Sequence, residues 1–358
     1  MKRATFTILI CSLPILVYVV LHVYPYDLSG EEADEKYYIE YRLPGEMLPI
    51  FYRDEYNIKF WGIEKLHPFD SRKYGKAFHR LVESNVIQAD RVVHPSKPKR
   101  DVLLKLHTDR YLKSLEISGN IARIAEVFPL RYLPWRLLHT RILNPMLYAT
   151  GGTILAARAA LERGWAINLG GGFHHASADN GGGFCFYDDI ALGVKILRSG
   201  SLNPIKIMIV DLDAHQGNGY EKDFLKDDSI YILDMYNADI YPNDIKAKLS
   251  IDRNIELRSG IGDSDYLDRL AKELEQAFGD FAPDLIIYNA GTDIMAGDPL
   301  GGMNISEQGI IQRDEMVFRM ALSKKVPIVM LLSGGYRKEN AAVIAKSIEN
   351  ILRIIPRI

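Results

Sequence analysis

The 358-residue sequence has little cysteine and little net charge, and each shortage excludes a class of protein. Its two cysteines, Cys11 and Cys185, offer no disulfide framework of the kind that holds small secreted domains together. The formal net charge of -2, without a basic tail, provides no field that would attract nucleic acid. Direct binding of DNA or RNA is therefore not expected. The sequence also shows no internal repeat and no low-complexity segment.

What is present fits a globular protein with one unusual end. Hydrophobic residues make up 47% and charged residues 25% of the chain, which is ordinary for a globular protein. The length suffices for one large α/β domain and an appendage. Cys185 lies within the run GGGFCF, where we expect a small buried residue rather than a reactive thiol.

The N-terminal segment 4–26 contains no Asp, Glu, Lys or Arg, and it is long enough to cross a bilayer as a helix despite Pro14. Lys2 and Arg3 precede it and acidic residues follow it, so the positive-inside tendency places residues 1–3 in the cytoplasm and the large domain across the membrane. We predict a single-pass membrane anchor bound to the lipid bilayer. A cleaved signal peptide, giving a secreted or periplasmic protein, and a helix packed on the domain are the alternatives.

Residues 27–45 are acidic, contain tyrosines and show neither a helical nor a strand period, which predicts a tether. From residue 46 to residue 358 the sequence predicts one globular domain of alternating strands and helices. Expected strands lie at 166–169, 205–210, 230–233, 255–257, 285–288 and 327–332, and expected helices at 150–163, 188–198, 219–225, 264–278, 306–323 and 340–352. Strands joined by helices predict one parallel sheet between two helical layers, an α/β/α architecture.

The run IVDLDAHQGNG, residues 209–219, ends a buried apolar strand with Asp211, Asp213 and His215. Alternating residues at a strand end point the same way, so two carboxylates and an imidazole come together there. Such a group repels itself unless a cation or several donors compensate it, which indicates a metal site. The alternative is a solvated loop with a helix-capping aspartate.

Three more apolar strands end in polar chemistry. AINLGGG leads to His174 and His175, LIIYNAGT leads to Asp293, and PIVMLLSGG leads to Tyr336. The carboxyl ends of parallel strands meet at one edge of a sheet, where ligands bind. We therefore expect these side chains to share one site.

These motifs resemble a known family. GGGFHHA with GGFCFYDD, DLDAHQGNG, YNAGTD and SGGY occur in the order found in zinc-dependent histone deacetylases of the arginase-deacetylase fold. The sequence is most similar to the class IV type, through EKLHPFD, RGWAINLGGGFHHAS, IVDLDAHQGNG and YNAGTDI followed by LGGMNIS. The resemblance covers about residue 48 to the C-terminus, and implies a catalytic domain at 46–358.

The resemblance assigns Asp213, His215 and Asp293 as zinc ligands. Three protein ligands leave positions open for water and substrate, as in catalytic sites, and the sequence does not distinguish Zn²⁺ from Fe²⁺. Tyr336 is then expected to donate its hydroxyl to the oxyanion. A structural K⁺ touching Asp211 is also implied.

For the histidine pair, the resemblance implies a base for water and an acid for the leaving amine. It places Asp211 behind His174, and Asn218 behind His175 where many relatives carry aspartate. An amide stabilises an imidazolium less than a carboxylate does, so we predict that His175 is less basic and is the main general acid-base. The alternative is that one histidine, His174 in particular, is only a buried structural donor.

The same resemblance places Gly183 and Phe184, and Tyr241 opposite them, in the wall of a narrow acyl-lysine tunnel. The alternative for Phe184 is ordinary core packing. The aspartate with which class I relatives hold the substrate backbone has no evident counterpart between Leu81 and Leu115.

The resulting prediction is a metal-dependent amidohydrolase that removes acetyl or longer fatty acyl groups from lysine side chains of proteins or peptides. A small-molecule deacetylase acting on acylpolyamines is the alternative within the fold. A non-catalytic acyl-lysine binder is a third possibility, which the complete set of ligands, histidines and tyrosine disfavours.

Overall fold

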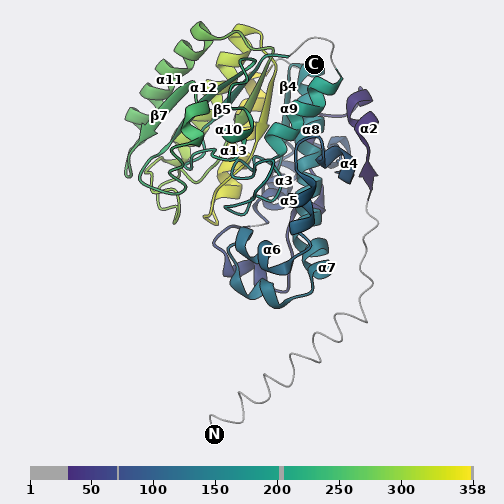
Figure 1. Ribbon diagram of the computed structural model, residues 1–358. Coiled ribbons are helices and arrows are strands. Elements are labelled where there is room, and N and C mark those ends of the chain that lie inside the picture. The colour runs from purple at the N-terminus through teal and green to yellow at the C-terminus, as the bar shows by residue number, and fades with distance from the viewer. Residues whose placement is uncertain (1–30, 71, 201–204, 356–358) are drawn as a thin grey trace. The chain divides into compact units, whose positions relative to one another are not determined.

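The computed structural model describes residues 31–70, 72–200 and 205–355, and in these residues seven parallel strands form the main sheet (Figure 1). The strand order is β2-β4-β9-β8-β5-β6-β7, and every neighbouring pair is parallel. The strands are β2 (Ile50–Phe51), β4 (Trp165–Asn168), β5 (Ile207–Asp211), β6 (Ile230–Asn237), β7 (Arg253–Leu257), β8 (Leu285–Asn289) and β9 (Ile328–Leu331). The prediction of a parallel sheet that carries the domain is confirmed.

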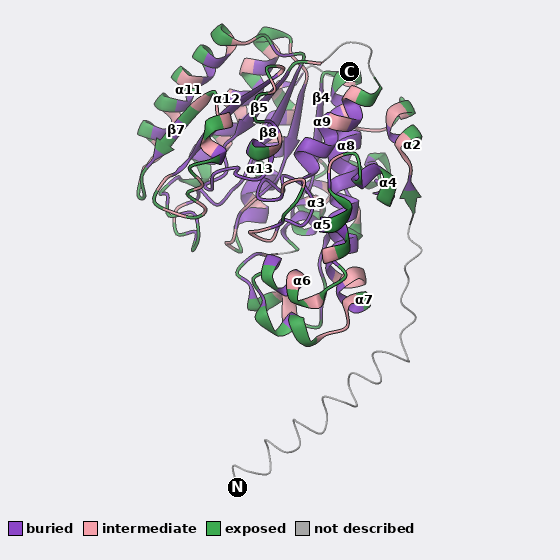
Figure 2. Cartoon of the chain, viewed as in Figure 1, coloured by how far each residue is buried: buried purple, intermediate pink, exposed green. Residues whose placement is uncertain are grey.

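The central strands are buried on both faces. Every residue of β4, β5, β8 and β9 is buried, and Figure 2 shows the sheet as a purple centre between green-edged helices. Continuous apolar runs such as IMIV in β5 are typical of strands covered on both sides. The edge strand β7 alternates instead between buried and exposed residues, because only one of its faces is covered.

The helices form two layers, as the connections between strands require. The connections that contain α8, α9 and α10 run along the sheet toward β7, and right-handed crossovers therefore place these helices on one face. The connections that contain α11 and α12 run in the opposite direction, so these helices lie on the other face. In agreement, α8 packs on α9, whereas α11 packs on α12, α12 on α13 and α13 on α3. The longer helices are α3 (Lys73–Glu83), α8 (Asn144–Arg163), α9 (Asp189–Ser199), α11 (Asp263–Asp280), α12 (Glu307–Lys324) and α13 (Asn340–Ile354), and α10 (Tyr220–Asp223) is short.

The described part of the expected tether differs from the prediction. Strand β1 (Glu32–Ala33) pairs with β3 (Lys97–Pro98), and helix α2 (Glu35–Glu40) follows it. The Asp34 side chain caps α2, and the buried Tyr38 donates its hydroxyl to the carbonyl of Ser96 at 2.7 Å. Elements of two and six residues are too short to show a period, so the sequence pattern failed to reveal them.

The predicted membrane anchor at 4–26 lies outside the described residues. Within the part of the chain that the structure describes, no helix has both the length and the apolar character needed to cross a bilayer.

The segment 117–143, which has no clear sequence pattern, folds into a small helical lobe. It contains α6 (Ser118–Ile124), the 3-10 helix η4 (Phe128–Tyr132), α7 (Trp135–Leu138) and the π-helix η5 (His139–Leu143). Figure 1 shows α6 and α7 at one end of the domain, below the sheet.

Candidate functional site

The predicted site residues follow four strands that are neighbours in the sheet. In the order β4-β9-β8-β5, the register pairs Asn168 with Leu331, Leu331 with Asn289, and Asn289 with Asp211. The four following loops therefore begin level with one another at the carboxyl edge. They carry His174 and His175 after β4, Tyr336 after β9, Asp293 after β8, and Asp213 and His215 after β5.

Asp213, His215 and Asp293 converge on one point. One ligand atom from each lies within 4.8 Å of the other two, and all three residues are buried. His215 Nδ1 is 3.1 Å from Asp213 Oδ1 and 2.9 Å from Asp293 Oδ2. The alternative of a solvated loop does not fit this geometry.

Backbone groups hold the two carboxylates from outside. The Gly334 amide donates to Asp213 Oδ2 at 2.8 Å, and the Ala214 amide donates to Asp293 Oδ1 at 2.8 Å. A Cβ atom on Gly334 would collide with an oxygen of both Asp213 and Asp293, so only glycine leaves this space open. Two carboxylates and one imidazole around such a space fit a divalent cation such as Zn²⁺ or Fe²⁺.

The electrostatics of the three residues also favour a cation. Burial and the neighbouring Asp213 raise the pKa of Asp293 to about 7. Burial acts the same way on Asp213, but His174 and His215 outweigh it and hold the pKa of Asp213 well below its usual range. Burial opposes the charge of His215, yet the two carboxylates raise its pKa to about 10. The pair of aspartates thus draws positive charge to the point between them.

His174 is oriented by a carboxylate. Its Nδ1 lies 2.9 Å from Asp211 Oδ2, and both side chains are buried. Burial lowers the pKa of His174, but Asp211 and Asp213 outweigh this effect and raise it to about 9. Asp211 is itself fixed by donors, because the Asn289 amide reaches Oδ1 at 3.0 Å and the Tyr220 hydroxyl reaches Oδ2 at 3.1 Å.

Behind Asp211 lie two buried acids that the sequence did not single out, Asp234 and Glu221. Asp234 is the register partner of Asp211 on β6. Burial, with a contribution from Asp211, raises the pKa of Glu221 to about 7 and that of Asp234 well above its usual value. No donor among the described residues reaches Asp234 Oδ1 or Glu221 Oε1. Two such neighbouring acids need a shared proton or a cation. Their carboxylate oxygens are therefore available as ligands for the predicted K⁺.

His175 is oriented by an amide instead. Its Nδ1 lies 2.8 Å from Asn218 Oδ1, and the Asn218 amide in turn donates to Asp244 Oδ2 at 3.3 Å. Asp244 also pairs with Lys222 at 2.6 Å. Burial, reinforced by the charges of His174 and His215, lowers the pKa of His175 well below its usual value. Asp244 is a further residue that the sequence analysis missed.

Tyr336 stands at the end of a loop that is fixed from below. Its backbone N–H donates to Asp298 Oδ2 at 2.8 Å, and the fully buried Lys73 donates to the carbonyls of Ser333, at 2.5 Å, and Gly334. Burial, with Asp293 and Asp213, raises the pKa of the Tyr336 hydroxyl well above its usual value, so it keeps its proton as a donor. Lys73 gave no signal in the sequence, because lysine is an ordinary polar residue of an amphipathic helix. Asp298 gave no signal either.

Gly183 and Phe184 form a strained turn beside the site, with φ angles of 49° and 63°. The Phe184 ring packs against Phe69, at 4.9 Å between centroids, and His67, at 5.1 Å. Tyr241 lies on the other side, with its ring 5.1 Å from that of His175. The structure therefore brings all three predicted wall residues to the site, together with Phe69 and His67, which the sequence analysis missed as wall residues.

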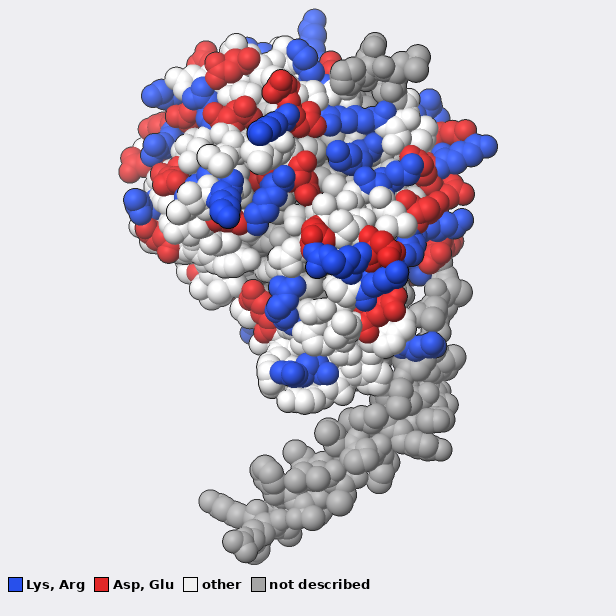
Figure 3. Space-filling model, in the orientation of Figure 1, with Lys and Arg blue, Asp and Glu red and all other residues white. Residues whose placement is uncertain are grey.

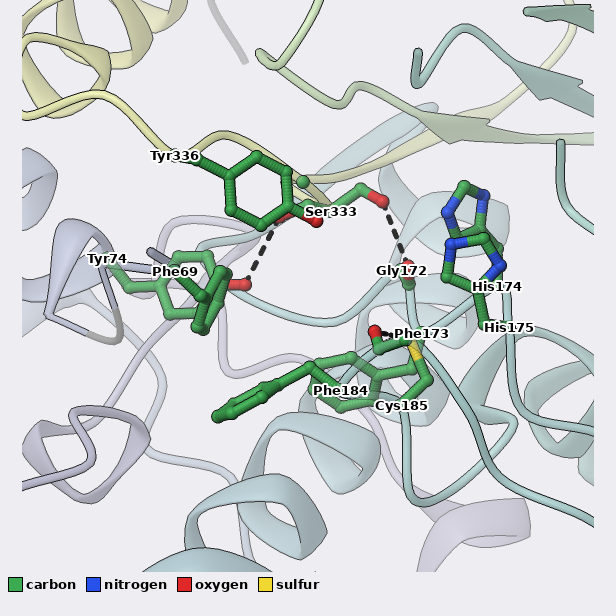
Figure 4. Close-up of a pocket in the computed structure, with 12 residues that line it drawn as sticks. Phe69, Tyr74, Gly172, Phe173, His174, His175, Phe184, Cys185, Ser333 and Tyr336 are labelled. Carbon is green, nitrogen blue, oxygen red and sulfur yellow. Dashed lines mark hydrogen bonds between the residues drawn. The ribbon is translucent and has the colours of Figure 1, made fainter. Parts of the chain in front are cut away.

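Two cavities adjoin these residues. An outer cavity of about 330 Å³ is lined by Glu126, His175, His215, Tyr241 and Tyr336, among others. An inner cavity of about 30 Å³ lies between the histidines, Phe184 and Tyr336, with Phe69, Tyr74 and Cys185 in its wall (Figure 4). Cys185 is buried, and burial raises the pKa of its thiol well above the usual value, as expected for an unreactive residue.

Known proteins share this fold and sequence pattern. The relatives include Histone deacetylase 2 of Arabidopsis thaliana, 50% identical over 313 residues that cover 87% of this chain and 80% of the relative. Histone deacetylase 8 of Xenopus tropicalis is 28% identical over 278 residues, which cover 74% of this chain and 73% of the relative. A solved structure titled "Crystal Structure of HDA15 HD domain" matches with a TM-score of 0.67 and 18% identity, covering 85% of this chain and 86% of that chain, and confirms the fold.

The family assignment rests on a direct match. The model of the histone deacetylase domain matches residues 67–352, which include every residue of the site built above. These comparisons do not assign a class, so the class IV relationship stays a prediction. The protein belongs to the histone deacetylase domain family.

Proposed function

We propose that this protein is a metal-dependent lysine deacylase that hydrolyses the amide bond between an acyl group and the ε-amine of lysine. The observation that carries the proposal is the convergence of Asp213, His215 and Asp293 beside two oriented histidines and the Tyr336 hydroxyl. Membership of the histone deacetylase family supports acetylated proteins or peptides as substrates.

Asp213, His215 and Asp293 would hold the metal ion. When bound, Zn²⁺ or Fe²⁺ supplies Lewis acidity toward the acyl carbonyl and water. Two carboxylate ligands reduce the effective charge of the ion, so the protein's own groups carry more of the catalytic burden than in a site of three neutral histidines.

His175 serves as the general base. Its low pKa leaves the imidazole neutral at physiological pH, and Asn218 occupies Nδ1, which leaves Nε2 for the proton of the attacking water. His174 carries its proton at the same pH, because its pKa is about 9, and stabilises developing negative charge. The protonated His175 then donates to the leaving lysine amine, which restores the neutral base.

Tyr336 stabilises the oxyanion. Its hydroxyl stays protonated, and the loop that carries it is held by Asp298 and Lys73, so the donor is oriented before substrate binds. Such a donor is typically worth about 100- to 1,000-fold in kcat.

The inner cavity bears on the length of the acyl group. Its volume of about 30 Å³ suits a short acyl group, and a fatty chain enters only if side chains such as Phe69 and Tyr74 move. We propose deacetylation as the basal activity and longer-chain removal as dependent on that movement. Comparing acetyl-lysine and myristoyl-lysine peptides measures the difference.

Acylpolyamines remain a second substrate class because the outer cavity contains a carboxylate, Glu126. Its Oε2 lies 3.6 Å from His67 Nε2, and this imidazole lowers the pKa of the Glu126 carboxyl, which favours its charged form. Faster hydrolysis of acetylspermidine than of an acetyl-lysine peptide would favour this alternative.

We also propose that residues 4–26 anchor the protein in a lipid bilayer, with the N-terminus in the cytoplasm. The uncharged length of this segment supports the proposal. Digestion of the catalytic domain by protease in sealed vesicles whose cytosolic face points outward would contradict this orientation.

The metal proposal is tested with the purified full-length chain and an acetyl-lysine peptide. We expect a chelator to abolish hydrolysis and Zn²⁺ or Fe²⁺ to restore it. Asp293→Asn should lower both bound metal and activity by about 100-fold or more, because it removes a ligand charge. Asp265→Asn, on the exposed surface of α11, is the matched control. Undiminished hydrolysis by metal-free protein would overturn the proposal.

A further inference from the structure

Large hydrophobic side chains are exposed on the helical lobe and at the neighbouring Trp61, whose ring Arg141 of the lobe contacts. Tyr132 is 73% exposed, Phe128 61% and Trp61 58%, and Ile117 is also 58% exposed. Phe128 and Tyr132 contact each other, with 5.9 Å between ring centroids. We call this surface the aromatic face, and it comprises Trp61, Ile117, Phe128, Tyr132 and Trp135.

Arginines lie against these rings. Arg131 stacks over Phe128 at 5.0 Å and over Tyr132 at 5.6 Å. Arg141 lies 5.4 Å from the ring of Trp61, and Arg136 lies 5.6 Å from that of Trp135. These guanidinium groups thus stack on rings, whereas Arg253 and Arg198 elsewhere pair with carboxylates.

The charge of the lobe is opposite to that of the whole chain. Residues 117–143 contain four arginines and one glutamate, although the protein carries a formal net charge of -2. In Figure 3 the lower end of the molecule, where Figure 1 places α6 and α7, shows white and blue groups. Aromatic rings accompanied by arginine are the side chains that settle at the boundary between lipid headgroups and acyl chains.

The start of the described chain lies close to this lobe. Glu32 pairs with Lys97 at 3.3 Å, and Lys97 Nζ lies 3.5 Å from Asn144, the residue that directly follows η5. The uncharged segment 4–26 ends five residues before Glu31, and five residues span at most about 18 Å. A bilayer that held the segment would therefore be within reach of the lobe.

We propose that the aromatic face rests on the surface of a bilayer that contains anionic phospholipids. The rings enter the interfacial region, and the arginines bind lipid phosphates. Nucleic acid is a poorer match, because the face is small and the chain as a whole is acidic.

The proposed contact extends the membrane attachment and the deacylase function proposed above. A groove of about 570 Å³ on the lobe is lined by Arg123, Glu126, Phe128 and Arg131, among others, and Glu126 also lines the outer cavity of the candidate active site. The mouth of the site would thus open beside the bilayer, where acyl-lysine side chains of membrane-bound proteins are presented.

Tryptophan fluorescence tests the contact without measuring activity. The chain has three tryptophans, and none lies in residues 1–60. Trp61 and Trp135 belong to the aromatic face, whereas Trp165 is buried in β4 and serves as an internal control. The full-length protein is bound to vesicles of phosphatidylcholine and phosphatidylserine that contain brominated lipid. We expect strong quenching, and we expect it to be lost when Trp61→Phe and Trp135→Phe are combined.

The role of the arginines is tested in the same vesicles. Combined Arg131→Gln, Arg136→Gln and Arg141→Gln should abolish the extra quenching that phosphatidylserine causes. Arg269→Gln, Arg319→Gln and Arg353→Gln, on exposed parts of α11, α12 and α13, form the matched control and should leave it unchanged.

Two results would overturn the proposal. One is equal quenching in the wild type and the double tryptophan variant while the protein floats with the vesicles, as expected if the face binds another protein. The other is quenching of the same strength in vesicles with and without phosphatidylserine. Failure of the full-length chain to float with vesicles would refute the anchor. Absence of acetyl-lysine hydrolysis by the wild-type protein would refute the deacylase function. Both results are independent of the quenching measurement.

Discussion

The surroundings of the two adjacent histidines differ more than their positions suggest. The rings of His174 and His175 are 4.2 Å apart and both are buried, yet the pKa of His174 is raised to about 9 and that of His175 is lowered well below its usual value. At His174 the carboxylates of Asp211, which contacts Nδ1, and Asp213 outweigh the effect of burial. At His175 only the Asn218 amide contacts Nδ1, so burial and the charges of His174 and His215 prevail. One site thereby holds a proton donor and a proton acceptor at the same pH.

Removing His175 should have the largest effect on this division of roles. We expect His175→Ala to lower kcat by about 100- to 10,000-fold, because the general base is lost, while bound metal stays constant. Steady-state kinetics with metal analysis measures both. His79→Ala, on the exposed side of α3, is the control. A larger loss for His174→Ala than for His175→Ala would reverse our assignment.

Making the His174 partner neutral should have the next largest effect. Asp211→Asn should lower kcat by about 10- to 100-fold. It should also lower the pKa of His174 from about 9, because the stabilising charge disappears. His174 acts while protonated, so activity falls as pH rises through the pKa of His174. In the variant this fall should occur at lower pH. An unchanged alkaline limb of the pH profile of kcat would show that His174 is only structural.

Giving His175 a carboxylate partner should make the two surroundings alike. Asn218→Asp should raise the pKa of His175, because a carboxylate favours the charged imidazolium. A base acts only when unprotonated, so activity is lost as pH falls through this pKa, and the acid limb should move to higher pH. Asn254→Asp, an exposed position on β7, controls for the added charge. An acid limb that stays in place would mean that His175 is not the base.

Removing the acceptor that holds the Asn218 amide should have the smallest effect on kcat. In Asp244→Ala the Asn218 amide loses its acceptor, and kcat should fall by less than about tenfold without a change in KM. Lys222→Ala removes the ion pair of Asp244 but keeps the contact with Asn218, so it should leave kcat unchanged. Equal losses in the two variants would indicate a general effect of the loop.

The sheet and the ends of its strands were predictable because their signal is local. Apolar runs that stop at Asp211, at Asn289 before Asp293, and at the glycines before His174 define both the strand and the edge at which its loop begins. Parallel pairing then brings the loops together, whatever the length of chain between them.

Residues that act from a distance were not predictable. Lys73 lies 260 positions from Ser333, and Asp244 lies 26 positions from Asn218, so no local pattern relates the partners. Glu126 belongs to a lobe without a clear period. The contribution of each depends on tertiary packing alone, which sequence patterns record poorly.

The ammonium group of Lys73 connects an early part of the chain to a loop that is synthesised much later. It binds the carbonyls of Ser333 and Gly334, near the end of the chain, and that same loop supplies the amide to Asp213 and the hydroxyl of Tyr336. A growing polypeptide that already contains Asp213, His215 and Asp293 still lacks these groups. A fragment truncated before β9 would therefore lack the Gly334 amide, the Tyr336 hydroxyl and both acceptors of Lys73, and we expect it to show no hydrolysis.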